Sequence, residues 1–66
     1  MDDADPIAFT DVEVLADNQL VLLCQVNGRL VSIPPGRMLP GTTLRRHGDR
    51  GTLVLTRKLA TMLGLT

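Results

Sequence analysis

Apolar and polar residues alternate along the first part of the chain with the two-residue period of a β-strand. Within residues 10–15, the acids Asp11 and Glu13 alternate with Val12 and Val14. Successive side chains of a strand point to opposite faces, so this pattern predicts a strand with one buried face and one wet face. The wet face of this strand is acidic.

The strongest local signal is the Asn27-Gly28 pair, which follows the most apolar stretch of the chain, residues 20–26. Both positions tolerate positive φ in a type I′ turn, so the pair predicts a hairpin and fixes its register. The expected pairs are Val26 with Arg29, Cys24 with Val31, Leu22 with Ile33, Gln25 with Leu30, and Leu23 with Ser32. The first three pairs form the core face. The other face still carries Val21, Leu23 and Leu30, which is more apolar surface than a solvated strand normally shows.

Proline and glycine dominate the segment after this hairpin. Pro34-Pro35-Gly36 and Leu39-Pro40-Gly41 each place proline ahead of glycine, as type II turns prefer. The two prolines at 34 and 35 cannot donate to a sheet ladder. An irregular corner is therefore expected over residues 33–42.

A second hairpin is expected around the turn-forming residues 47–50, with residues 42–46 and 51–56 as its strands. The expected inward pairs are Leu44 with Leu53 and Thr42 with Leu55. This hairpin would bring the strand count to five.

The chain is expected to end in a short helix over residues 57–63, capped by the Thr56 hydroxyl and terminated at Gly64. Its apolar stripe consists of Leu59, Met62 and Leu63. Two helical turns are marginal in isolation, so the helix must dock on the sheet or on a partner.

These elements predict an all-β fold, either a small five-stranded SH3-like barrel or a strongly bent antiparallel sheet, with a short C-terminal helix. Residues 1–6 are interpreted as an acidic flexible arm, and residues 7–66 as a single domain.

A chain of 66 residues has a thin core, because it buries only about 60% of its unfolded surface. Scaffolds below roughly 70 residues usually add disulfides, a metal or a partner subunit. Cys24 is the single cysteine and His47 the single histidine, so neither an intrachain disulfide nor a zinc site is expected. We therefore expect no metal or cofactor, and a homo-oligomer, either a dimer or a ring. The candidate interface residues are Val21, Leu23, Leu30, Leu59, Met62 and Leu63.

Targeting signals are not evident in the sequence. No run approaches the ~18 apolar residues of a membrane span, and the acidic N-terminus is unlike a signal peptide. The expected location is a bacterial-type cytoplasm, with no membrane partner.

The zero net charge hides a strong asymmetry along the chain. All seven basic residues follow the Asn27-Gly28 turn: Arg29, Arg37, Arg45, Arg46, Arg50, Arg57 and Lys58. Six of the seven acids precede it: Asp2, Asp3, Asp5, Asp11, Glu13 and Asp17. Such a charge distribution is evidence about binding partners and the electrostatic steering of their approach, and not about the fold.

The basic residues of the second hairpin and the helix start predict an anion-binding surface. Its candidate residues are Arg45, Arg46, Arg50, Thr56, Arg57 and Lys58. Arginine offers bidentate contacts to phosphate, and nucleic-acid backbone is the expected anion. With Phe9 as the only aromatic and a net charge of zero, duplex backbone is a better candidate than single-stranded bases.

Three other interpretations remain open at this stage. The basic residues could form a solvated face, pair with Asp11 and Glu13 across strands, or dock an acidic protein surface. An enzyme is not expected, because the chain has no paired acids, nucleophile–base set or metal cluster. His47 is expected to be a turn residue or a pH-sensitive phosphate contact, and Cys24 a small buried core residue.

Residues 51–65, GTLVLTRKLATMLGL, resemble the strand-and-helix segment of the swapped-hairpin, AbrB-type transcription regulators. Those proteins are dimers that bind DNA, so the resemblance implies the same class of partner. It covers under a quarter of the chain, and Thr56 stands where the family usually has proline.

Overall fold

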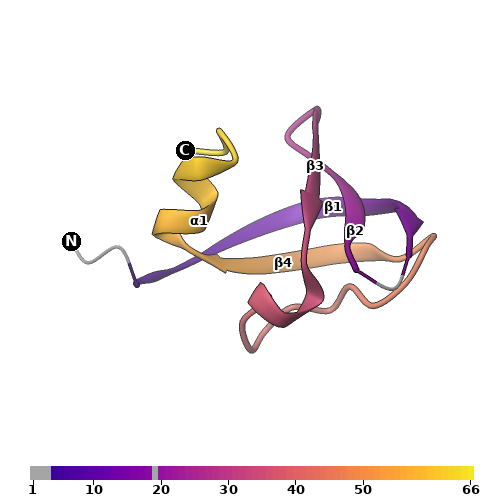
Figure 1. The fold of residues 1–66 in the computed structure, drawn as a ribbon, viewed down its shortest axis with the longest axis horizontal. Helices are drawn as coiled ribbons and strands as arrows, with labels where there is room; N and C mark the ends of the chain where they lie inside the picture. Colours follow the sequence, from indigo (N-terminus) through magenta and orange to yellow (C-terminus); the bar gives the residue numbers. More distant parts are fainter. Residues whose placement is uncertain (1–3, 19) are drawn as a thin grey trace.

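The computed structural model describes residues 4–18 and 20–66, which form a mostly β domain (Figure 1). Its elements are β1 (Pro6–Asp17), β2 (Leu22–Val26), β3 (Arg29–Ile33), the 3₁₀ turn η1 (Pro35–Arg37), β4 (Arg50–Thr56) and α1 (Arg57–Met62). The four strands make one antiparallel sheet in the order β3-β2-β1-β4.

The prediction of an all-β fold with a short C-terminal helix is confirmed, whereas five strands and a closed barrel are wrong. The described residues form four strands and an open sheet. Of the arm predicted over residues 1–6, residues 1–3 lie outside the described part, and Pro6 already begins β1.

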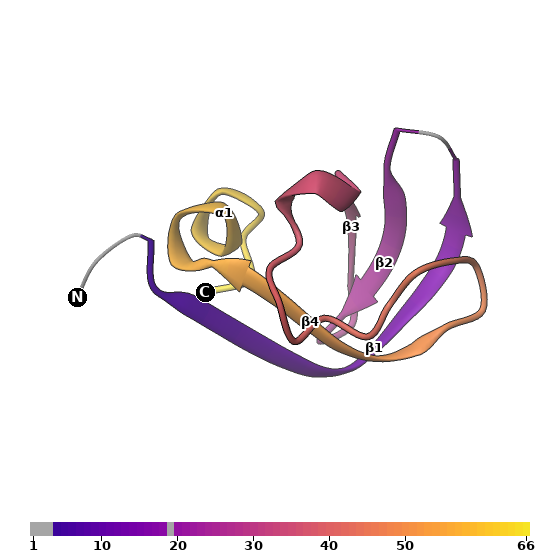
Figure 2. The same ribbon diagram turned by 90° about the horizontal axis from the view of Figure 1, so that it is seen from below.

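The sheet is strongly bent because its long strand, β1, changes partners along its length. Its first half pairs with β4 and its second half with β2. The register shifts between Phe9 and Val12, where Asp11 has a φ of 56°, and again between Val14 and Ala16. Figure 2 shows the result as a trough with α1 and η1 on its concave side.

The first of these bulges also sets which side chains enter the core. Residues three apart point to opposite faces of a regular strand, but an extra residue restores a common face. Phe9, Val12 and Val14 are therefore all buried, while Asp11 stays exposed. The predicted alternation between acids and valines is confirmed over residues 11–14.

The hairpin of β2 and β3 has the predicted register at every position. Asn27 and Gly28 both have positive φ, 52° and 79°, as a type I′ turn requires. Cys24 is fully buried, which confirms its core role.

The predicted second hairpin is only half right, because residues 42–46 do not form a strand. The Thr42 hydroxyl accepts from the Val54 N–H at 3.0 Å, and the Thr43 N–H donates to the Thr52 carbonyl at 2.9 Å. The N–H groups of Arg45 and Arg46 bond to a side chain instead of a strand. Side-chain acceptors thus replace the ladder that the sequence pattern predicted. Leu44 is still buried in the core.

The expected irregular corner is present between β3 and β4, with one turn of the predicted type. Thr42 donates to the Leu39 carbonyl at 3.2 Å and Gly41 has a φ of 103°, consistent with a type II turn. At the other Pro–Gly site η1 forms instead, because Arg37 and Met38 donate to the Pro34 and Pro35 carbonyls.

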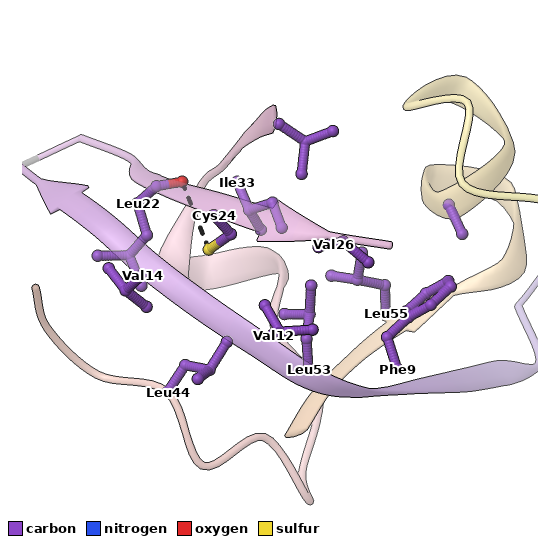
Figure 3. Packing of buried hydrophobic residues seen from close by; sticks show 12 residues of the cluster. Phe9, Val12, Val14, Leu22, Cys24, Val26, Ile33, Leu44, Leu53 and Leu55 are labelled. Atoms are coloured by element: carbon purple, nitrogen blue, oxygen red, sulfur yellow. Dashed lines mark hydrogen bonds between the residues drawn. The ribbon is translucent and has the colours of Figure 1, made fainter. Parts of the chain in front are cut away.

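Helix α1 closes the end of the trough over the core (Figure 3). The Thr56 hydroxyl accepts from the Leu59 N–H at 3.2 Å, which confirms the predicted cap. Gly64, with a φ of 76°, donates to the Thr61 carbonyl, and Leu65 donates to the Ala60 carbonyl. This is a Schellman ending, and it directs Leu65 onto the core.

Candidate anion-binding surface

The predicted basic residues lie in two groups at opposite ends of β4. The loop group consists of Arg45, Arg46 and Arg50, and the helix group of Thr56, Arg57 and Lys58. A strand rises roughly 3.3 Å per residue, so Arg50 and Thr56 are about 20 Å apart. The length of β4 therefore separates the loop group from the helix group, as Figure 1 shows by the course of β4 from the loop to α1.

Two carboxylates fix the backbone of the loop group. Asp49 accepts the N–H groups of Arg45 and Arg46 at 2.8 and 3.1 Å, and Asp17 accepts the His47 N–H at 2.6 Å. The bonds to Arg45 and Arg46 lower the pKa of the Asp49 carboxyl, with their charges contributing further. Both acids thus serve the backbone of the loop.

The side chains of Arg45 and Arg46 in the loop group, and of Lys58 in the helix group, keep their charge unpaired. Within residues 4–18 and 20–66, no carboxylate makes an ion pair with Arg45, Arg46 or Lys58. All three side chains are exposed. Cations in this state are open to an external anion.

Arg50 has a more acidic environment than its neighbours in the loop. It lies directly opposite Glu13 in the β1–β4 register. A polar recess with a volume of about 290 Å³ is lined by Arg50 together with Glu13, Asp11 and Asn27. Nearby acids weaken the attraction of Arg50 for an external anion.

The helix group is differently arranged from the prediction. The Leu59 N–H is bonded to Thr56, so it is not available to an anion. The Arg57 N–H donates to the Asp5 carbonyl at 2.8 Å, and its Nε is buried with no hydrogen-bond partner. The exposed positive charge of this group is that of the Lys58 side chain.

Arg37 joins the helix group in space, although sequence reasoning left it out of the site. It lines a groove of about 360 Å³ with Lys58 and Thr56 and with the apolar side chains of Pro34, Leu59 and Met62. Lys58 is 21 residues away from Arg37 in the chain. The Pro34-Pro35-Gly36 sequence predicted a turn at this position. No local sequence pattern indicates that this turn approaches the start of α1.

The residues proposed for subunit contact fall on two separate surfaces. Leu23 and Leu30 lie on the outer face of the β2–β3 hairpin, where Leu30 is 57% exposed. At the C-terminal helix, Leu59 of α1 and Leu63 just after it pack against the chain's own core, and Met62 is 73% exposed. Val21, which precedes β2, is partly buried.

His47 and Cys24 offer little for chemistry. His47 is an exposed loop residue. The Cys24 Sγ lies 3.8 Å from the Leu22 carbonyl, and burial raises the pKa of its thiol, which disfavours the nucleophilic thiolate (Figure 3). Among the described residues, no group of three or more His, Cys, Asp or Glu side chains is placed to hold a metal ion.

No family model, curated protein or solved structure matches the chain. No helix within residues 4–18 and 20–66 has the length and apolar character that a membrane crossing requires.

Proposed function

We propose that this protein is a non-enzymatic binding module, active as a homo-oligomer, whose basic residues contact the phosphates of duplex nucleic acid. Arg45, Arg46 and Lys58 carry most of the attraction. Arg50 and Arg57 contribute less to phosphate binding, because Arg50 lies beside acids and Arg57 is partly buried. The Thr56 hydroxyl can donate a further hydrogen bond to a phosphate.

The observation that carries the proposal is the absence of ion pairs at these cations in the described part of the chain. The acids nearest the loop accept backbone N–H groups instead, so they fix the loop backbone without an ion pair to either arginine side chain. Unpaired arginine suits phosphate because its planar fork binds two oxygens at once.

The separation of the two groups supports a linear polyanion over a small ligand. A free phosphate could contact only one end of β4, whereas a duplex presents phosphates along the whole distance of about 20 Å. The scarcity of aromatic side chains supports backbone contact over base stacking.

Salt dependence of duplex binding tests the proposal. Replacing Arg45 and Arg46 together by alanine should weaken binding by about 1–2 kcal/mol, or roughly tenfold, for every duplex sequence. The slope of log affinity against log salt should become shallower by about 1.8, because each phosphate contact contributes about 0.9.

The charge-preserving pair Arg45→Lys and Arg46→Lys is the matched control and should keep most of the salt slope. If wild-type protein fails to retard any duplex at ~50 mM salt, the proposal is wrong. Unchanged affinity in the alanine pair would place the site elsewhere.

The Arg37–Lys58 groove favours a second candidate, a docking site for an acidic protein segment. Its lining combines two cations with three apolar side chains and contains no acid. A partner with an apolar side chain next to carboxylates would match this chemistry. In this case the protein would bind no duplex.

A further inference from the structure

We propose that β3 is a dimerisation seam, at which the free edges of β3 from two copies of this chain pair antiparallel and join the two sheets. The inference rests on one part of the proposed function, the formation of a homo-oligomer. It does not depend on nucleic-acid binding.

The backbone of β3 presents unpaired groups to the edge of the sheet. In a hairpin with a two-residue turn, Val26 and Arg29 form a hydrogen-bonded pair, and such pairs then alternate along the ladder. Leu30 and Ser32 therefore point their N–H and C=O groups away from β2. No other described residue bonds to them.

The other sheet edges carry features that block strand pairing. Beside β4, the segment at residues 39–43 bonds to Thr52 and Val54. The free side of β1 begins with Pro6 and is interrupted by the bulge at Asp11. Proline, bulges and covering loops are the usual protections of an edge.

The β3 edge has none of these protections. Residues 30–33 contain no proline and no charge. The one charged residue of the strand, Arg29, is turned toward the helix end, because its Nη1 would lie 3.0 Å from a Cβ placed on Gly64. An exposed apolar edge without a charge favours pairing with another strand.

The edge is also complementary to itself. Pro34 has no N–H and residues 27–28 form the turn, so Leu30 and Ser32 are the two usable positions. A two-fold axis at Val31 would set Leu30 of one copy opposite Ser32 of the other, with four backbone hydrogen bonds. The two Leu30 side chains would lie diagonally, within contact distance, next to Leu23 on the outer face. The zero net charge of each chain adds no overall repulsion.

Sedimentation equilibrium on Ser32→Pro and Ser32→Ala tests the seam. Proline removes an N–H that faces away from β2, so the hairpin keeps its own bonds. Wild type and Ser32→Ala should have the mass of two chains, and Ser32→Pro should associate at least about tenfold more weakly. Circular dichroism identifies a Ser32→Pro chain that has not folded. Leu30→Lys, with Ala8→Lys on β1 as its exposed control away from the β3 edge, then gives the same comparison.

The register has its own test. Leu30→Cys chains mixed with Ser32→Cys chains should form the mixed disulfide, because hydrogen-bonded partners have Cα atoms about 5.5 Å apart. Two Leu30→Cys chains would be about 8 Å apart, too far for a disulfide, so their homodimer should not accumulate.

The possible failures point to different conclusions. A monomeric wild type would overturn the seam and the homo-oligomer together, without affecting duplex binding. A dimer unchanged by both Ser32→Pro and Leu30→Lys would overturn the seam alone. Disulfides between identical variants in preference to the mixed one would overturn the two-fold register.

Discussion

Asp49 fixes the backbone of Arg45 and Arg46 without an ion pair to either guanidinium group. Its acceptance of the Arg45 and Arg46 N–H groups depends on the ionised form, which is why its pKa is lowered. A lowered pKa in the folded protein means that the stabilisation is complete above the ordinary aspartate pKa of about 3.9. It is lost as pH falls through the lower folded-state value.

Acid titration followed by amide NMR should therefore move the Arg45 and Arg46 signals with a midpoint below the ordinary aspartate pKa. Asp49→Asn is the control, because its amide oxygen can still accept one N–H but does not ionise. In that variant the two signals should not follow the same titration. A midpoint at or above the ordinary value in wild type would contradict the role given to Asp49.

At the level of the elements, the pairing of β4 with the preceding loop depends on one glycine. A Cβ on Gly51 would overlap the Thr43 hydroxyl, which accepts the Thr52 N–H. We expect Gly51→Ala to lower the melting temperature, since displacing Thr43 breaks this exposed hydrogen bond at a cost of about 0.5–1.5 kcal/mol.

Gly36 in η1 provides the matched control for this substitution. It has no atom within 4 Å of an added Cβ and no positive φ. Gly36→Ala should leave stability unchanged or raise it by about 0.4–1 kcal/mol, through the lower entropy of the unfolded chain. Equal effects of the two alanines would show that the Thr43 contact does not stabilise β4.

The elements also show which parts of the fold a sequence determines locally. The β2–β3 hairpin was predicted pair by pair, because Asn27-Gly28 fixes the turn geometry and the turn fixes the register. The second hairpin was not, because Asp49 and Thr42 supply side-chain acceptors that compete with the ladder. The hydrophobic pattern of a sequence does not indicate where side-chain acceptors replace backbone acceptors.

The same limit applies to the candidate site. Arginine and lysine were recognised from residue type, but their distances depend on the length of β4 and the fold of η1. The groups at Arg45 and Lys58 proved to be separate, and Arg37 was left out, because non-local packing decides both. The alternating pattern of acids and valines also did not predict the bulge at Asp11, where the sheet bends.

On the scale of the whole molecule, the two basic groups lie far enough apart to act independently. The molecule measures 33 Å along its longest axis, and the ends of β4 span about 20 Å of it at the rise of a strand. When two sites lie more than about 10 Å apart and share no side-chain partner, the changes in free energy caused by altering each of them add. If one linear polyanion contacts both groups through separate phosphates, the losses in binding free energy from altering the two groups should add in a double-mutant cycle.

Lys58→Ala should weaken duplex binding even when Arg45 and Arg46 are already alanine. The salt slope should become shallower by about a further 0.9, because one more phosphate contact is lost. Retardation assays on one duplex over a salt series measure both quantities, with Gln25→Ala as a control that changes no charge. If Lys58→Ala changed neither affinity nor slope in either background, the duplex would contact only the loop group. The Arg37–Lys58 groove would then be left for an acidic protein.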